Sequence, residues 1–88
     1  MPNIVITHKV VDLERWLKYK QERVEQLAPF ATHVTDHVAA DGSKNVSVTA
    51  DVSDVAALQS AMASPPPELA AAMDRHGVIP PLTAYVEK

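Results

Sequence analysis

Apolar and polar residues alternate along two segments between positions 31 and 52, which are joined at Asp41-Gly42. A period of two is typical of β-strands, because successive side chains point to opposite faces of a sheet. The Asp-Gly pair favours a tight turn. The pattern therefore predicts a hairpin whose strands run from Ala31 to Ala40 and from Asn45 to Val52.

The two faces of this predicted hairpin differ sharply in chemistry. One face is apolar and consists of Val34, Val38, Val46, Val48, Ala50 and Val52. The other face carries imidazole, hydroxyl and carboxylate groups, from His33, Thr35, His37, Ser47, Thr49 and Asp51. A solvated strand face usually carries Lys, Glu, Arg and Gln, and none of these is present here. The pattern therefore predicts a sheltered polar pocket on this face.

Two further strands are predicted at the ends of the chain. The β-branched segment from Asn3 to Val10 is typical of a strand. The segment from Val78 to Glu87 has the same character, but Pro80-Pro81 cannot donate ladder hydrogen bonds, so its beginning must lie at an edge or a bulge. Alternation places Thr83 and Tyr85 on the face of His37. In the first strand either Val5 and Thr7 or Ile4 and Ile6 share that face.

Helical spacing begins after Asp12, which is a suitable N-cap. The apolar positions Leu13, Trp16, Leu17, Val24 and Leu27 form one stripe, and Pro29 ends the helix or disfavours its last turn. Four basic residues are interleaved with acidic ones on this segment, which indicates a solvated helix face: Arg15, Lys18, Lys20 and Arg23.

A second helical region follows the hairpin and is split by Pro65-Pro66-Pro67. Ser53 is the predicted cap of its first half, from Asp54 to Ala63. Pro67 suits the first turn of the second half, and Gly77 is the expected stop. The inward residues are predicted to be Val55, Leu58, Met62, Leu69, Met73 and His76.

The element order is thus β-α-β-β-α-β, which predicts an α+β fold: a ferredoxin-like antiparallel sheet with helices on one face. The 88 residues form one domain, residues 1–88. A chain of this size buries only about 60% of its unfolded surface, and without cysteines it has no disulfides. We therefore expect the open sheet face to be covered by a second copy.

Charge and hydropathy exclude several function classes. The net charge of −3 argues against nucleic-acid binding, which needs a basic patch. No apolar run approaches the roughly 20 residues needed to cross a membrane. Met1-Pro2-Asn3 shows no secretory signal pattern. The expected location is cytoplasmic, the expected partner is another copy of the chain, and no cofactor is expected.

Several segments resemble a known superfamily. His8–Trp16 resembles the H-K-V-x-D-x-x-R-W opening of many small dimeric α+β barrel proteins, and Asp51–Leu58, a Ser-Pro start, Ala71–Met73 and Gly77-Val78 are similar to their second half. These are the antibiotic biosynthesis monooxygenase-like proteins. The resemblance covers nearly the whole chain through mostly structural motifs. The three consecutive prolines depart from the pattern.

The resemblance implies a homodimer in which two sheets pack face to face and enclose a cavity in each half. Members include cofactor-independent oxygenases, haem-degrading enzymes, lactone isomerases, polyketide cyclases and many proteins with no known activity, so the fold does not select a reaction. The haem-degrading members use an Asn, a Trp and a His in set places. The sole tryptophan here, Trp16, lies on a predicted core stripe, so that site is not carried over.

His33 and His37 are the first candidates for chemistry. On a strand they would lie about 13 Å apart, too far for one metal ion. Asp51 is the better partner. One register of the hairpin places Asp51 opposite His33 and Ser47 opposite His37, and the other places Asp51 opposite Thr35. In both registers a carboxylate lies near a histidine, as in a general-base pair.

The predicted function is binding of a small organic molecule, with turnover by proton abstraction next to a carbonyl and without a metal. The catalytic candidates are His33, His37 and Asp51. The ligand-binding candidates are Thr35, Thr49, Ser47, Tyr85 and His8. The alternative is a non-enzymatic ligand-binding or accessory dimer, and haem or metal held by a single histidine is a third hypothesis.

Overall fold

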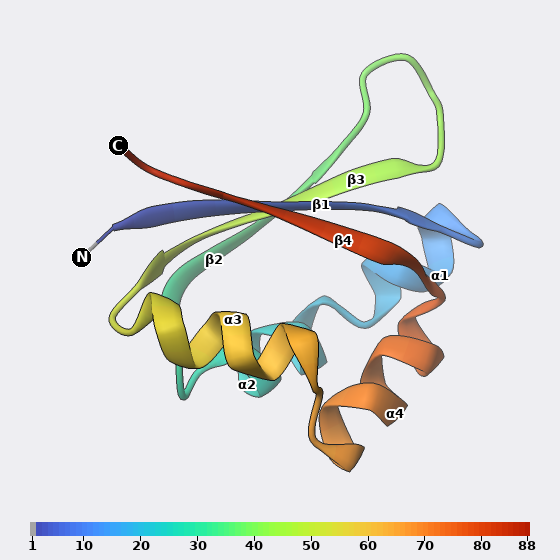
Figure 1. The fold of residues 1–88 in the computed structure, drawn as a ribbon. Coiled ribbons are helices and arrows are strands. Elements are labelled where there is room, and N and C mark those ends of the chain that lie inside the picture. The colour runs from blue at the N-terminus through green and yellow to red at the C-terminus, as the bar shows by residue number, and fades with distance from the viewer. Residues whose placement is uncertain (1) are drawn as a thin grey trace.

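The computed structural model describes residues 2–88 and contains one four-stranded antiparallel sheet with strand order β2-β3-β1-β4. The four helices all lie on one face of the sheet, and the other face is bare (Figure 1). This confirms the predicted ferredoxin-like α+β fold. The elements are β1 (Asn3–Val10), α1 (Leu13–Lys18), α2 (Lys20–Leu27), β2 (Ala31–Val38), β3 (Asn45–Val52), α3 (Val55–Ala63), α4 (Pro67–His76) and β4 (Val78–Val86).

The core lies between the sheet and the helices. Alternation in β1 turns Ile4 and Ile6 toward the helices, where both are buried, and leaves Val5 and Thr7 on the bare face. This settles which set of side chains lines each face of β1. The remaining buried apolar residues come mainly from β3 and the helices: Val10, Ala31, Val46, Val48, Ala50, Val52, Trp16, Leu58, Ala61 and Ala72.

The first helical region differs from its prediction in two ways. It breaks at Tyr19 into α1 and α2, and Leu17, predicted on the core stripe, is 45% exposed. Arg23, predicted on the solvated face, is instead buried. Arg23 lies seven residues after Trp16 and four before Leu27, a spacing that keeps it on the stripe of the two apolar residues. The sequence prediction was wrong because it grouped Arg23 with the exposed charged residues by its polarity and did not consider its helical spacing from Trp16 and Leu27.

The other elements follow the sequence with small shifts. The cap of α3 is Asp54 rather than Ser53, since the Asp54 carboxylate accepts the Ala57 amide hydrogen bond at 3.0 Å. Gly77 ends α4 in the left-handed region with φ of 74°, which a residue without a Cβ adopts most easily. The predicted irregularity in β4 is confirmed, because its pairing with β1 shifts register between Thr7 and Lys9, opposite the two prolines.

Within residues 2–88, no helix is both long and apolar enough to span a membrane.

Candidate functional site

Side chains on the bare face of the sheet form four rows that cross the strands, and one outer row consists of Ile79, Lys9 and Asn45. We call this surface the open face. The first row is Thr83, Thr7, Ser47 and His37, and the second is Tyr85, Val5, Thr49 and Thr35. The third contains Asn3, Asp51 and Thr32. Seven of the eight side chains of the first two rows carry a hydroxyl or an imidazole, so the open face is a polar platform.

A β-bulge at His33 sets the geometry of the third row. The pairing of β2 with β3 shifts register between Thr32 and Thr35, and His33 has a φ of 55°. Positive φ is uncommon outside glycine, and bulges often re-aim a side chain. Here Nδ1 of His33 lies 3.0 Å from Oδ2 of Asp51. The two residues are therefore neighbours even though Asp51 pairs with Thr32 in the ladder.

This contact selects the tautomer of His33. An ionised carboxylate only accepts hydrogen bonds, so Nδ1 of His33 is the donor and Nε2 keeps its lone pair. The other oxygen of Asp51 accepts a hydrogen bond from the Asn3 amide at 3.4 Å. The His33 side chain is 81% exposed. The arrangement can accept a proton at Nε2 from a molecule on the open face, and Asn3 is a part of it that the sequence did not reveal.

His37 occupies the opposite end of the hairpin. It pairs with Ser47 in the ladder, as the first of the two predicted registers required, and its Nε2 lies 3.3 Å from the Thr49 hydroxyl. His37 and His33 are four residues apart on the strand β2, a separation of about 13 Å. The structure therefore does not bring the two histidines to one point.

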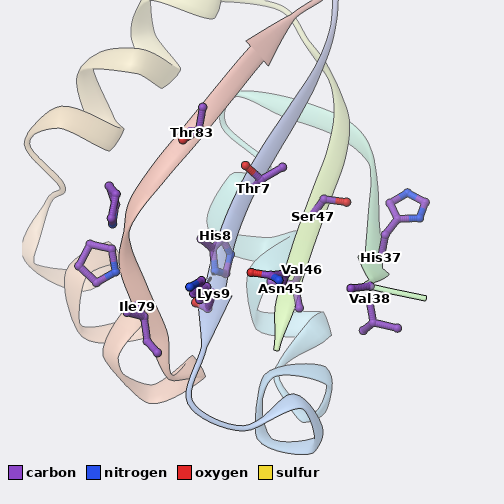
Figure 2. Close-up of a pocket in the computed structure, with 13 residues that line it drawn as sticks. Thr7, His8, Lys9, His37, Val38, Asn45, Val46, Ser47, Ile79 and Thr83 are labelled. Carbon is purple, nitrogen blue, oxygen red and sulfur yellow. Dashed lines mark hydrogen bonds between the residues drawn. The ribbon is translucent and has the colours of Figure 1, made fainter. Parts of the chain in front are cut away.

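A concavity of about 690 Å³ opens beside His37 at the end of the first row. Figure 2 shows its side chains distributed over β1, β2, β3 and β4. The lining residues are Thr7, His8, Lys9, His37, Val38, Ala39, Asn45, Val46, Ser47, Ile79, Pro80, Pro81 and Thr83. Its volume falls within the roughly 300–1,000 Å³ typical of small-molecule sites, and it combines apolar walls with a few polar groups as such sites do.

The predicted site residues divide between this concavity and the rest of the open face. His37, Ser47 and His8 line the concavity. Outside it, but still on the open face, lie Thr35, Thr49, Tyr85, His33 and Asp51.

The placement of His8 differs from that of the other candidates. Its side chain is buried and its ring lies edge-on to Trp16, with 6.0 Å between centroids. Nδ1 of His8 lies 3.0 Å from the carbonyl oxygen of Lys9. His8 thus separates the concavity from the core rather than standing among the exposed groups of the open face.

A buried polar network on the helix side was missed by the sequence prediction. Arg23 donates to Asp36 through two hydrogen bonds, of 2.7 Å from Nη2 and 3.3 Å from Nε. Its Nη1 donates to the carbonyl of Trp16 at 2.7 Å, and its guanidinium lies 4.0 Å from the centre of the Trp16 ring. Asp36 sits on the face of Val34 and Val38, so this ion pair joins α2 to β2 inside the core.

His76 extends this network to α4. Its Nδ1 lies 3.4 Å from Nη1 of Arg23 and its Nε2 lies 3.2 Å from a carboxylate oxygen of Glu22. A guanidinium has no acceptor, so Nδ1 of His76 must accept and Nε2 must donate. The ring also stacks on Tyr19 with a centroid distance of 5.1 Å. These contacts require the neutral imidazole, and a small cavity of about 80 Å³ nearby is below the usual size of a ligand site.

The buried histidines predict a loss of stability in acid. Burial lowers the pKa of His76 below its ordinary value of 6.5, against the opposing effect of the hydrogen bond that Nε2 donates to Glu22, and burial also lowers the pKa of His8. As the pH falls below about 6.5, these histidines therefore bind protons in the unfolded chain before they do so in the folded chain. The free energy of unfolding then declines by at most about 1.4 kcal/mol per pH unit for each histidine.

The test is the melting temperature of wild type and His76→Gln between pH 7.5 and pH 5.5. The wild-type melting temperature should fall over this interval, and the variant should lose part of that pH dependence while His8 keeps the rest. Lys20→Gln, at an exposed position of α2, is the control that removes no histidine and should leave the slope as in wild type. An equal slope in wild type and His76→Gln would contradict the prediction.

In the part of the chain that the structure describes, no group of three or more His, Cys, Asp or Glu side chains is arranged to hold a metal ion.

Comparison with known proteins gives matches in structure but not in sequence. No known family profile matches the chain, and no curated protein matches it. Similar solved structures include an antibiotic biosynthesis monooxygenase, at a TM-score of 0.65 and 14% identity, with 100% of this chain and 97% of that chain covered. A protein of Agrobacterium tumefaciens has a TM-score of 0.66 at 13% identity, with coverage of 100% and 92%.

A third similar structure is a proposed antibiotic biosynthesis monooxygenase from Deinococcus radiodurans, with a TM-score of 0.58 at 13% identity and coverage of 97% and 90%. These similarities extend over nearly the full length of each chain. They show the fold, and they agree with the resemblance found in the sequence. At this level of identity they assign no activity.

Proposed function

We propose that this chain, which has the antibiotic biosynthesis monooxygenase-like fold, is a homodimeric protein that binds a small organic molecule on its open face. The observation that carries the proposal is the concavity of about 690 Å³ beside His37. It offers an apolar wall from Ile79, Pro80 and Pro81 and the hydroxyls of Thr7 and Ser47. This is the combination by which proteins hold and orient small ligands.

The proposed chemistry is removal of a proton next to a carbonyl group. His37 is the base that lines the concavity, and the hydroxyls of Ser47 and Thr7 would donate to the oxygen that becomes negative as the proton leaves. Return of the proton to another carbon gives an isomerisation. In an oxygenation, molecular oxygen would be the second substrate.

His33 with Asp51 is the second candidate base. Its Nδ1 lies 3.0 Å from Asp51, which leaves Nε2 as the ring nitrogen that can face a ligand. However, it lies outside the concavity. Thr35, Thr49 and Tyr85, which fill the row between the two histidines, are the proposed contacts for a ligand that extends from one end of the open face to the other.

Self-association is proposed from the composition of the open face. Its two central rows contain five threonine or serine residues, one valine and the exposed Tyr85, with His37 at one edge and no carboxylate or lysine. Covering hydroxyl groups costs less solvation free energy than covering carboxylate or ammonium groups, and tyrosine is enriched in interfaces.

The experiment begins with native mass spectrometry of the purified protein, which reports the oligomeric state and any retained ligand. Turnover is then measured as loss of α-proton NMR signals from a panel of small ketones and lactones in D₂O. We expect His37→Gln to slow exchange by about 100-fold or more, with Lys20→Gln, an exposed position of α2 on the other side of the sheet, as a control that keeps wild-type exchange. If His33→Gln rather than His37→Gln abolishes exchange, the base is His33.

A dimer that binds members of the panel without exchanging their protons would favour the alternative, a ligand-binding or accessory protein without turnover. A monomer that binds none of them would contradict the proposed function.

A further inference from the structure

We infer that the ligand held in the concavity beside His37 is an organic anion, with a carboxylate as its charged group. The inference rests on the proposed function and specifies the substrate class of the same site. It comes from the charges around the concavity, which differ from those of the chain as a whole.

The concavity is lined by basic side chains and by no acidic ones. Among its thirteen lining residues Lys9 is the one lysine or arginine, and none is an aspartate or glutamate. The whole chain has the opposite balance, with 11 acidic residues against 8 lysines and arginines and a net charge of −3. The concavity is therefore a local positive region on an acidic protein, and a region of this kind attracts and orients anions.

Lys9 is the main source of this charge. It lies near the end of β1 between Asn45 on β3 and Ile79 on β4, and it is exposed. None of the ion pairs formed among residues 2–88 involves its ammonium group. An ammonium group without a carboxylate partner at the edge of a hollow is free to pair with a charged ligand.

The acidic residues of neighbouring elements are engaged elsewhere. Asp36 is adjacent to His37 in sequence, but its side chain points to the core and binds Arg23. Asp41 lies in the β2–β3 turn and its carboxylate accepts the Ser43 amide hydrogen bond at 2.8 Å. Asp51 lies four residues along β3 from Ser47, beyond the concavity. No carboxylate of these strands therefore neutralises Lys9.

The remaining polar groups suit a carboxylate. Thr7, Ser47 and Thr83 each provide a hydroxyl that can donate to an anionic oxygen. Val38, Ile79, Pro80 and Pro81 form the apolar part of the lining, which suits a carbon skeleton rather than an inorganic ion. Figure 2 shows Lys9 between the hydroxyl of Thr7 and the apolar Ile79, so charge and apolar surface adjoin.

The test compares two probes of closely similar shape, the anion 1-hydroxy-2-naphthoate and the neutral 1-hydroxy-2-naphthamide, by titration calorimetry at pH 7. We expect the acid to bind the wild type about tenfold more tightly than the amide, as an added charge-assisted contact provides. Lys9→Gln should remove this preference and leave the affinity for the amide unchanged. Lys9→Arg should restore it, and added NaCl should weaken the acid alone.

Lys20→Gln is the matched control, since it removes an exposed lysine from α2 on the other side of the sheet, and it should bind both probes as wild type does. Equal affinity for the two probes would overturn the inference and leave the proposed function standing. A preference for the acid that survives in Lys9→Gln would overturn the assignment to Lys9. If neither probe binds at millimolar concentration, the proposed function fails as well.

Discussion

Replacing Asp36 with alanine should lower the free energy of unfolding by about 3–5 kcal/mol, because it leaves the Arg23 guanidinium buried without its counter-charge. The side chains of Arg23 and Asp36 are only 9% and 3% exposed, and they meet at 2.7 Å. Typical domains are stable by only about 5–15 kcal/mol. The loss would therefore consume a large part of the total stability, although Asp36 touches no part of the proposed ligand site.

The measurement is urea denaturation at a fixed protein concentration, which is needed because self-association would also affect the midpoint. Glu25→Gln removes an exposed carboxylate from α2 and is the matched control, with an expected change within about 0.5 kcal/mol. Asp36→Asn provides a milder variant that should still fold and allow a measurement. A loss below about 1 kcal/mol for Asp36→Ala would show that the ion pair is not buried as described.

The double variant Arg23→Met with Asp36→Leu separates the charge from the packing. Removing both charges of a buried pair is often nearly neutral. Here Arg23 also donates to the carbonyl of Trp16 and faces Nδ1 of His76, and the double variant leaves both acceptors without a donor. We therefore expect it to be more stable than Asp36→Ala but less stable than wild type.

The second large effect is expected from Trp16→Ala, which should lower the unfolding free energy by about 3–5 kcal/mol. Trp16 is fully buried at the centre of the α1–sheet contact, between the ring of His8 and the guanidinium of Arg23. Leu17→Ala changes the next residue of the same helix. Leu17 is 45% exposed, so its truncation should change stability by no more than about 0.5 kcal/mol.

Trp16→Phe refines this comparison. The indole nitrogen of Trp16 is buried without a hydrogen-bond partner among the described residues, so phenylalanine would fill much of the space without removing a hydrogen bond. Trp16→Phe should therefore retain most of the unfolding free energy that Trp16→Ala loses. Similar losses for Trp16→Ala and Leu17→Ala in urea denaturation would contradict the orientation of α1.

The comparison of these neighbours shows where sequence reasoning succeeded and where it failed. The strand pattern predicted β1 and β3 with the bounds that the structure has, and it separated the apolar and polar faces of the hairpin correctly. Alternation in a strand is unambiguous, because a residue can point only to one side or the other. The side chains of a helix point in all directions around its axis, so there is no sharp boundary between buried and exposed positions. Leu17, next to Trp16, was therefore assigned to the core stripe, whereas it lies at the margin of that stripe.

The burial of both charges of this network could have been predicted from their positions alone. Arg23 has the helical spacing of Trp16 and Leu27, and Asp36 has the strand parity of Val34 and Val38. Opposite charges on two faces that must both be buried indicate an ion pair, since an isolated buried charge is too costly. What the sequence could not reveal is that these two particular charges, 13 residues apart, would meet.

The sequence by itself determined the order of the elements, the ferredoxin-like fold and the polar character of the open face, because these follow from local periodicity and from turn residues such as Gly42 and Gly77. The tertiary structure alone decided which of these polar groups meet. The bulge at His33 joins it to Asp51, and the register shift in β4 places Ile79 beside Lys9 to form the concavity. Both depend on how strands from distant parts of the chain pair, and this pairing is set by the packing of the whole sheet on its helices.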